Sequence, residues 1–268
     1  MDVAFLIGSG TSVSLGLPDT QKITDRIFPL QDVIFFSDGH FYYGKPRLNF
    51  PEELEYNEII NKILQFIIEE IEKSNNYLHK NAVYNYEYLF YLASLLNDFL
   101  YGKEENVLIL ESIKKLKNYL GASLNNFKYG LFEVLIKVIQ YIEDMVRINL
   151  LVRPKDYEGL SFLKDAYNDK DIDNIHIFSL NHDLVIEEIF KNNNEFTNGF
   201  GKEINGVKYW DKSLFSMKYK VKLYKLHGSI SWFYFIPNKG NNNILFGDIG
   251  GMRTFIIPRI LKVNINGQ

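Results

Sequence analysis

The chain has 268 residues, of which 46% are hydrophobic and 15% aromatic, enough for one large core or for a core and a smaller helical module. Its net charge of −3 gives no long-range attraction to nucleic acid or anionic lipid. A phosphate-bearing ligand therefore has to be bound by groups in direct contact with it. The absence of cysteine excludes disulfides, thiol nucleophiles and thiolate zinc sites.

No targeting or membrane-spanning segment is evident. The first residues lack the basic region and apolar core of a signal peptide, and no run reaches the roughly 18 apolar residues needed to cross a bilayer. We therefore predict a cytoplasmic protein without a membrane partner and without direct binding to nucleic acid.

The most informative stretch is residues 8–21, G-S-G-T-S-V-S-L-G-L-P-D-T-Q, which follows the apolar run 3–7. The pattern predicts a buried strand that ends in a glycine-rich turn. Gly8 and Gly10 can take positive φ, and without a Cβ they let backbone N–H groups approach a phosphate. An ordinary tight turn is the alternative, because strand-turn-helix junctions are common.

The next elements argue against a dehydrogenase-type dinucleotide site. A helix is expected over residues 21–27, followed by V-I-F-F-S-D-G-H-F-Y-Y at 33–43, where Asp38-Gly39 predicts a hairpin turn. The hairpin explains Asp38 better than a role as the acid that binds ribose. The third glycine of G-x-G-x-x-G is also missing, since Val13 stands there.

Residues 51–151 have a helical pattern. Apolar side chains recur at helical spacing in four successive stretches, 60–71, 89–99, 109–120 and 131–146. Four amphipathic helices in a row predict a bundle. We interpret the apolar stripes as core packing of an inserted helical module, with an assembly surface or a lid as the alternatives.

Two later strands end in polar residues. The run I-H-I-F-S-L at 175–180 is followed by Asn181-His182-Asp183 and an expected helix over 184–190, and the strand 221–226 is followed by His227-Gly228-Ser229. Polar residues at the carboxyl ends of parallel strands face the ligand crevice. Asp183 is equally well explained as a helix cap. Asn181 can simply finish its strand, and a lone histidine is more often structural than catalytic.

These patterns predict an α/β fold, a doubly wound Rossmann-like parallel sheet with an inserted helical module. We expect residues 1–50 and 152–268 to form the nucleotide-binding domain and residues 51–151 to form the helical insertion. The glycine loop, Asn181 and His227 then meet at one edge of the sheet.

Three motifs, taken in order, resemble the sirtuin superfamily of NAD-consuming enzymes. The first family signature, G-A-G-x-S-x-x-x-G-I-P-D-F-R, is matched by Gly8, Gly10, Ser12, Gly16, Pro18 and Asp19. The second, T-x-N-Y-D, is similar to Ser179-Leu180-Asn181-His182-Asp183, and the third, L-H-G-S, to residues 226–229. The resemblance implies a sirtuin-like fold that binds NAD.

The departures from the family pattern disfavour protein deacylation. Deacylases carry a zinc ribbon held by four cysteines, and Thr20 and Gln21 replace the Phe and Arg that follow the loop Asp. The helical insertion, the turn Asn198-Gly199-Phe200-Gly201 and K-L-H-G-S-I-x-W instead resemble the sirtuin-like NAD hydrolase domains of bacterial antiphage defence proteins.

The resemblance implies a role for each motif residue, with NAD as substrate and no metal. Asn181 would place the ribose or the attacking water, and His227 would act as a base. Asp19 would line the nicotinamide end, and Asp183 would bond within the pocket or cap its helix. The residues expected to receive the pyrophosphate are Gly8, Ser9, Gly10, Thr11 and Ser12, and Gly228 and Ser229 complete the expected binding set.

The same resemblance implies partners and a longer chain. Defence NAD hydrolases are usually held inactive until a partner, a phage component or a nucleotide signal arrives, and they often work as oligomers, so we expect a homo-oligomer or a defence-system partner protein. In the family, further strands follow a segment like Ile256-Ile257-Pro258, so we expect the protein to continue beyond residue 268. A non-catalytic module that senses NAD or another nucleotide is the alternative from a different functional class.

Overall fold

The computed structural model describes residues 1–30, 32–36, 39–45, 51–78, 84–103, 106–204, 206–235 and 245–248. Asp38 and residues 256–258 lie outside these ranges. The chain divides into two compact units, one made of Met1–Asp19 with Leu150–Gln268 and the other of Thr20–Asn149. The first unit contains all three predicted motifs. Residues 20–50, which we had assigned to the nucleotide-binding domain, group with the helices of the second unit.

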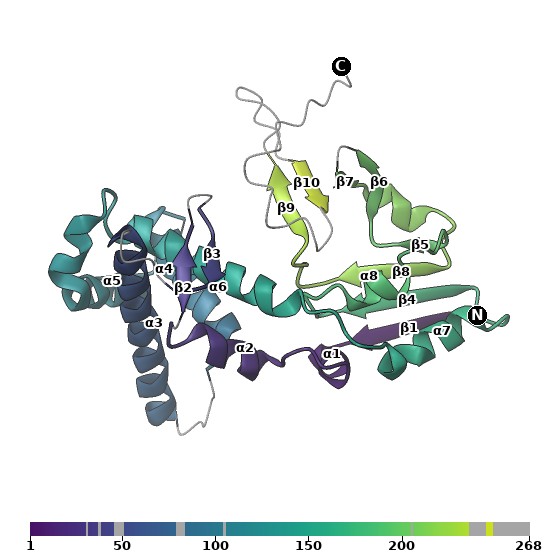
Figure 1. The fold of residues 1–268 in the computed structure, drawn as a ribbon, viewed down its shortest axis with the longest axis horizontal. Helices are drawn as coiled ribbons and strands as arrows, with labels where there is room; N and C mark the ends of the chain where they lie inside the picture. Colours follow the sequence, from purple (N-terminus) through teal and green to yellow (C-terminus); the bar gives the residue numbers. More distant parts are fainter. Residues whose placement is uncertain are drawn as a thin grey trace, which may run out of the picture. The chain divides into compact units, whose positions relative to one another are not determined.

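A parallel sheet forms the centre of the first unit (Figure 1). Its strands are β1 (Asp2–Ile7), β4 (Asn174–Ser179), β8 (Val221–Lys225) and β5 (Phe196–Thr197), in the spatial order β1-β4-β8-β5. All three pairings are parallel. The three longer strands confirm the sequence prediction, and a four-stranded parallel sheet flanked by helices is compatible with a Rossmann-like α/β fold.

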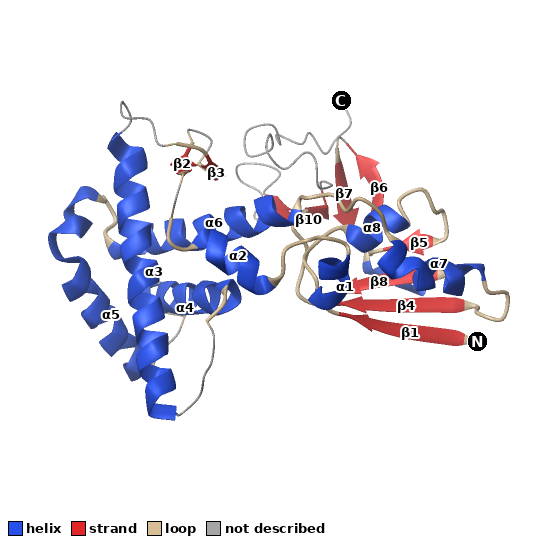
Figure 2. Ribbon diagram, turned by 60° about the horizontal axis from the view of Figure 1, so that its bottom comes forward, coloured by secondary structure: helices blue, strands red, loops and turns tan. Residues whose placement is uncertain are grey.

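Short helices cover one face of this sheet (Figure 2). They are α1 (Ser9–Ser14), α7 (Ser161–Asn168), preceded by the 3₁₀ turn Glu158–Leu160, and α8 (Val185–Ile189). The alternate strand residues Ile175, Ile177 and Leu223 are almost fully buried, and Phe5 packs against Phe162 of α7 at 5.3 Å between ring centroids. The covered face therefore holds the core of this unit.

Neither glycine at the start of the first loop uses the positive φ that glycine permits. Gly8 has φ −114° and ψ 179°, and Gly10 lies inside α1, so neither occupies the left-handed region. The loop closes into a short helix directly after the strand, and the left-handed position falls at Gly16, with φ +89°. The helix was missed because S-G-T-S-V-S has a low intrinsic preference for helix.

A second, antiparallel sheet follows in the same unit. It consists of β6 (Phe200–Ile204), β7 (Val207–Trp210), β10 (Leu245–Asp248) and β9 (Trp232–Phe235), and the 3₁₀ helix Lys212–Ser216 follows β7. Gly199 has φ +85°, and a Cβ there would lie 2.3 Å from Trp210 Cζ3. Only glycine fits at this turn, because any side chain would collide with the indole ring.

The second unit contains the predicted hairpin and helices. It begins with α2 (Thr20–Ile27), and β2 (Val33–Phe35) pairs with β3 (Phe41–Tyr43) in antiparallel fashion. The four long helices are α3 (Pro51–Leu78), α4 (Tyr86–Leu100), α5 (Val107–Leu120) and α6 (Leu131–Leu150), with the 3₁₀ helix Gly121–Asn126 between the last two. Leu89, Leu116 and Val134 are fully buried, as expected for stripes that pack a core.

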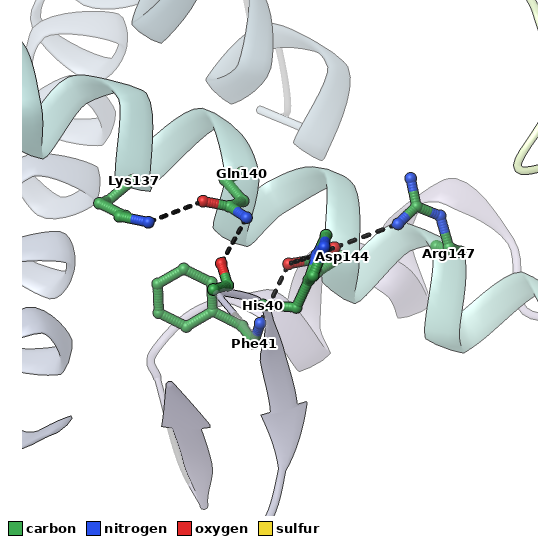
Figure 3. A network of polar contacts seen from close by, with 7 residues as sticks. His40, Phe41, Lys137, Gln140, Asp144 and Arg147 are labelled. Atoms are coloured by element: carbon green, nitrogen blue, oxygen red, sulfur yellow. Dashed lines mark hydrogen bonds and ion pairs between the residues drawn. The ribbon is translucent and has the colours of Figure 1, made fainter. Parts of the chain in front are cut away.

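A polar network holds the hairpin against α6 (Figure 3). The Asp144 carboxylate, whose side chain is 5% exposed, accepts a hydrogen bond from the backbone N–H of Phe41 at 3.0 Å. It also lies 3.0 Å from His40 Nδ1 and 3.2 Å from Arg147 Nη1. Gln140 Nε2 donates to the carbonyl of Gly39 at the hairpin turn. A buried carboxylate with these partners is stabilising only while all of them are present.

We predict that Asp144→Ala lowers the free energy of unfolding by about 3 kcal/mol, because it leaves buried donors and a cation without their acceptor. Asp98→Ala is the matched control, since Asp98 makes an exposed ion pair with Lys103 at 3.4 Å and its loss should cost less than about 1 kcal/mol. Urea denaturation of the variants measures both values. Equal losses in the two variants would show that the Asp144 network does not stabilise the hairpin.

Candidate active site at the carboxyl edge of the sheet

The three motif segments leave the sheet from adjacent strands at the same edge. The last residues of β1, β4 and β8 are in register, with Ile7 opposite Ser179 and Ser179 opposite Lys225. The N–H of Leu180 donates to the carbonyl of Ile7, and the N–H of Leu226 donates to the carbonyl of Ser179, both at 2.9 Å. Register and parallel direction therefore place the three segments side by side, as the sequence predicted.

A buried hydrogen-bonded cluster joins the first two segments. Ser12 Oγ donates to Asp183 Oδ2 at 2.6 Å and accepts from Asn181 Nδ2 at 2.8 Å. Asn181 Nδ2 also donates to the carbonyl of Gly8 at 3.1 Å. The three side chains are 5% to 8% exposed. The hydroxyl of Ser12 thus fixes two of the predicted site residues, which lie about 170 positions away in the sequence.

Asp183 is hydrogen-bonded both in the cluster and at the start of α8. Its Oδ2 accepts from Ser12 in the cluster, while its Oδ1 accepts from the backbone N–H of Val185 at 3.0 Å, in the first turn of α8. This bond satisfies an N–H group at the start of α8, although the N-cap residue itself is Leu184 and makes no side-chain cap hydrogen bond. The carboxylate is therefore fixed in orientation from both sides.

Asn181 retains one unused acceptor. Its Oδ1 is buried and has no hydrogen-bond partner among the described residues, although both the Nδ2 group and the backbone N–H of Asn181 are engaged. Buried amide oxygens are nearly always paired, so this oxygen calls for a donor beyond the described residues. A ligand hydroxyl or a water molecule has the required chemistry.

The glycine loop presents backbone more than side chains. Thr11 Oγ1 donates to the carbonyl of Gly8 at 2.8 Å, and Ser12 is committed to the cluster, whereas Ser9 and Gly10 are exposed. A Cβ added at Gly8 or Gly10 would meet nothing within 4 Å. The backbone at Gly8 and Gly10 is thus open to the approach of a ligand. The side chains of Thr11 and Ser12, which we expected to receive the pyrophosphate, are instead bonded to other groups of the protein. Asp19, half-buried, ends this part of the unit.

The third segment carries His227 on the surface. The His227 side chain is exposed, and its ring centroid lies 6.3 Å from that of His182. The N–H of Ile230 donates to the carbonyl of His182 at 3.0 Å, which ties this turn to the second segment. Gly228 has φ +89°, a conformation that favours glycine, and Ser229 Oγ lies 3.2 Å from the fully buried Ser231 Oγ.

Sequence reasoning missed three charged or titratable residues here: His182, Glu187 and Lys225. Burial, followed by the positive charge of Lys225 and the neighbouring His227, lowers the pKa of His182 from 6.5 to about 4, so its imidazole is neutral at physiological pH. Strand periodicity was the available signal for Lys225, because it shares the covered face with Val221 and Leu223.

A separate cavity of about 280 Å³ lies beside this cluster. Its lining includes Leu17, Leu151, Tyr157, Leu184 and Val185, all from the first unit. Neither Asn181 nor His227 lines it. We therefore base the candidate site on the hydrogen-bonded strand-end segments.

Within the described ranges, no cluster of three or more histidine, aspartate or glutamate side chains is arranged to hold a metal ion. No helix in those ranges is both long and apolar enough to cross a membrane. Comparison with known proteins identifies no matching family model and no matching curated protein.

The lowered pKa of His182 predicts a pH dependence of stability. Because the folded value lies below 6.5, the unfolded chain binds more protons between pH 6.5 and about 4. The contribution of His182 is therefore fully present above pH 6.5 and is lost as the pH falls toward 4, by about 3 kcal/mol in total.

Urea unfolding of the wild type and of His182→Gln between pH 4 and 7.5 measures this contribution. The difference between their unfolding free energies should change across that window. His176→Gln, a change on β4 away from its carboxyl end at a histidine paired with Tyr224, serves as the control. Parallel pH profiles for the wild type and His182→Gln would contradict the prediction.

Proposed function

We propose that this protein is an NAD hydrolase, which cleaves the nicotinamide–ribose bond to give nicotinamide and ADP-ribose. The observation that carries the proposal is the cluster of Ser12, Asn181 and Asp183, with an unpaired Asn181 oxygen, at a strand edge shared with His227. These residues come from the three segments that resemble the sirtuin superfamily, and the helical insertion and K-L-H-G-S-I-x-W add the resemblance to its NAD hydrolase domains. The same resemblance supports depletion of NAD in antiphage defence, by a homo-oligomer or with a partner protein.

The reaction asks little of the protein beyond position and electrostatics. When the bond from C1′ of the ribose to the nicotinamide nitrogen breaks, its electron pair neutralises the positive charge of the pyridinium ring. The ribose develops oxocarbenium character, and a water oxygen then bonds to C1′. In this proposal Asn181 Oδ1 accepts a hydrogen bond from a ribose hydroxyl or from that water.

His227 is the proposed base. It takes a proton from the ribose hydroxyl or from the attacking water, and its exposure leaves the imidazole accessible to a bound substrate. Gly228 and Ser229, in the same turn, complete the binding surface. No step is assigned to a metal ion, because the leaving group is already cationic.

The remaining residues bind the substrate. Backbone N–H groups at Ser9 and Gly10, where side chains leave space, receive the pyrophosphate, with Gly8, Thr11 and Ser12 shaping the loop. Asp19 lines the nicotinamide end. Asp183 acts through its bond to Ser12, which orients the amide of Asn181.

A non-catalytic NAD or nucleotide sensor is the second candidate. The exposed position of His227 favours it, because a base that is open to water is less organised for catalysis than a buried one. NAD-dependent protein deacylation is the weaker alternative, since the chain has no cysteine for the zinc ribbon of that branch.

We predict that the purified chain releases nicotinamide from NAD and that His227→Ala lowers the rate by about 10² to 10⁴-fold, the range typical of a positioned base. Asn181→Ala should lower the rate as well, because it removes the acceptor for the ribose or water. His176→Gln, on β4 away from the strand ends, should retain the wild-type rate. Chromatography of the products measures all four proteins.

The outcomes separate the candidates. Absence of nicotinamide release, together with no difference between wild type and variants, would overturn the hydrolase proposal. Saturable NAD binding by calorimetry without turnover would favour the sensor. Release of nicotinamide only when an acylated peptide is added would favour deacylation.

A further inference from the structure

Lys225 is a buried cation at the end of β8, two residues before His227. Its side chain is 2% exposed, on the face of the sheet that α8 covers. Burying an ammonium group is costly unless it is paired and hydrogen-bonded. The contacts that compensate this buried charge therefore indicate the structural role of Lys225.

Those contacts join three segments. Lys225 Nζ donates a hydrogen bond to the backbone carbonyl of Asp183, in the turn that follows β4. It also lies 3.2 Å from Glu187 Oε1, on α8. One charged group thus ties the end of β8 to the turn that carries Asn181 and Asp183 and to the helix that follows this turn.

Lys225 and Glu187 each depend on the other to compensate a buried charge. Burial raises the pKa of Glu187, and the carboxylates of Asp183 and Asp248 raise it further, while Lys225 lowers it. Neither carboxylate oxygen of Glu187 accepts a hydrogen bond from the described residues. Lys225 therefore supplies the main compensation for this charge, and removing it alone leaves a buried carboxylate uncompensated.

Asp183 is held from two directions. Its side chain is bonded to Ser12 and to the N–H of Val185, and its peptide carbonyl is bonded to Lys225. The position of Asn181, two residues earlier, depends on the same turn. Without Lys225, the link between this turn and the strand that leads to His227 would rest on backbone contacts such as the bond from Ile230 to the His182 carbonyl.

We infer that Lys225 is a positioning residue of the candidate site, which sets the turn carrying Asn181 and Asp183 relative to the turn carrying His227. Its catalytic consequence rests on the proposed NAD hydrolysis. Its structural consequence does not depend on that reaction. It can be measured separately at His182, because the charge of Lys225 acts on that imidazole.

Four variants of the full chain test this inference. Lys225→Met removes the cation, Lys225→Arg keeps it, and the double variant Lys225→Met/Glu187→Gln also removes the carboxylate that would otherwise be stranded. Lys222→Met is the matched control. Lys222 lies on the same strand and its Nζ also donates to a backbone carbonyl, that of Phe215 at 2.7 Å, outside the three segments of the site.

The first measurement is the NMR titration of the His182 imidazole. The groups that act on it are Lys225, His227 and Asp183, of which only Lys225 changes. We expect the midpoint to rise in Lys225→Met and in the double variant, and to stay at the wild-type value in Lys225→Arg and Lys222→Met. If Lys225→Met does not fold, the double variant, in which both charges are absent, decides the result.

The second measurement is nicotinamide release. We expect the double variant to lose about 10² in kcat with little change in KM, since a displacement of about 1 Å costs that much in a positioned reaction. Lys225→Arg should recover part of the loss, and Lys222→Met should keep the wild-type kcat.

Two results would overturn the inference: an unshifted His182 midpoint in the folded double variant, or a wild-type kcat in that variant. A failure of the proposed function is distinguishable from both. In that case the wild type releases no nicotinamide, and the His182 titration tests only whether the charge of Lys225 acts at this edge of the sheet.

Discussion

The in-register ending of three parallel strands is the constraint on which the candidate site depends. The pairing of β1, β4 and β8 aligns Ile7, Ser179 and Lys225, so the residues that follow them lie together at the same edge of the sheet. A shift of one residue between β1 and β4 would separate the Ser12 hydroxyl from Asn181 and Asp183, and one between β4 and β8 would displace Lys225 and His227 relative to them. The site is thus a property of the sheet register more than of any one loop.

Around that edge, polar groups are buried and nearly all are satisfied. Hydrogen bonds join Ser12 to Asn181 and to Asp183. The charges of Lys225 on β8 and Glu187 on α8 compensate one another. Within the described residues, the Asn181 oxygen and the two Glu187 carboxylate oxygens accept no hydrogen bond, and Lys225 compensates the charge of Glu187. Such networks are rigid when complete, because each lost partner leaves a desolvated group behind. Rigidity of this kind is what a site needs if it is to position a substrate in advance.

The sequence predicted the elements whose signals are local. The apolar run before Gly8, the helical stripes such as Leu89 to Phe99, and the Asp-Gly hairpin signal depend on neighbouring residues, and the corresponding strand, helix and hairpin are present. The helix at Ser9–Ser14 was missed because tertiary bonds from Asn181 and Asp183 support a segment of low helix preference. Lys225 and His182 were overlooked for a similar reason, since their importance arises from contacts across strands. No local pattern encodes the pKa of His182.

The order of the strands also determines when the site can exist. β1 lies at the start of the chain, yet its sheet partner β4 begins at Asn174, and the strand that completes the edge ends at Lys225. At about 5–20 residues per second, a ribosome needs roughly 10 to 45 s to make the chain between Ile7 and Lys225. During synthesis the Gly8 loop therefore lacks its hydrogen-bond partners Asn181 and Asp183 until they are made. Assembly of the edge is a late, long-range event in folding, and a nascent chain cannot carry a complete site before β8 has emerged.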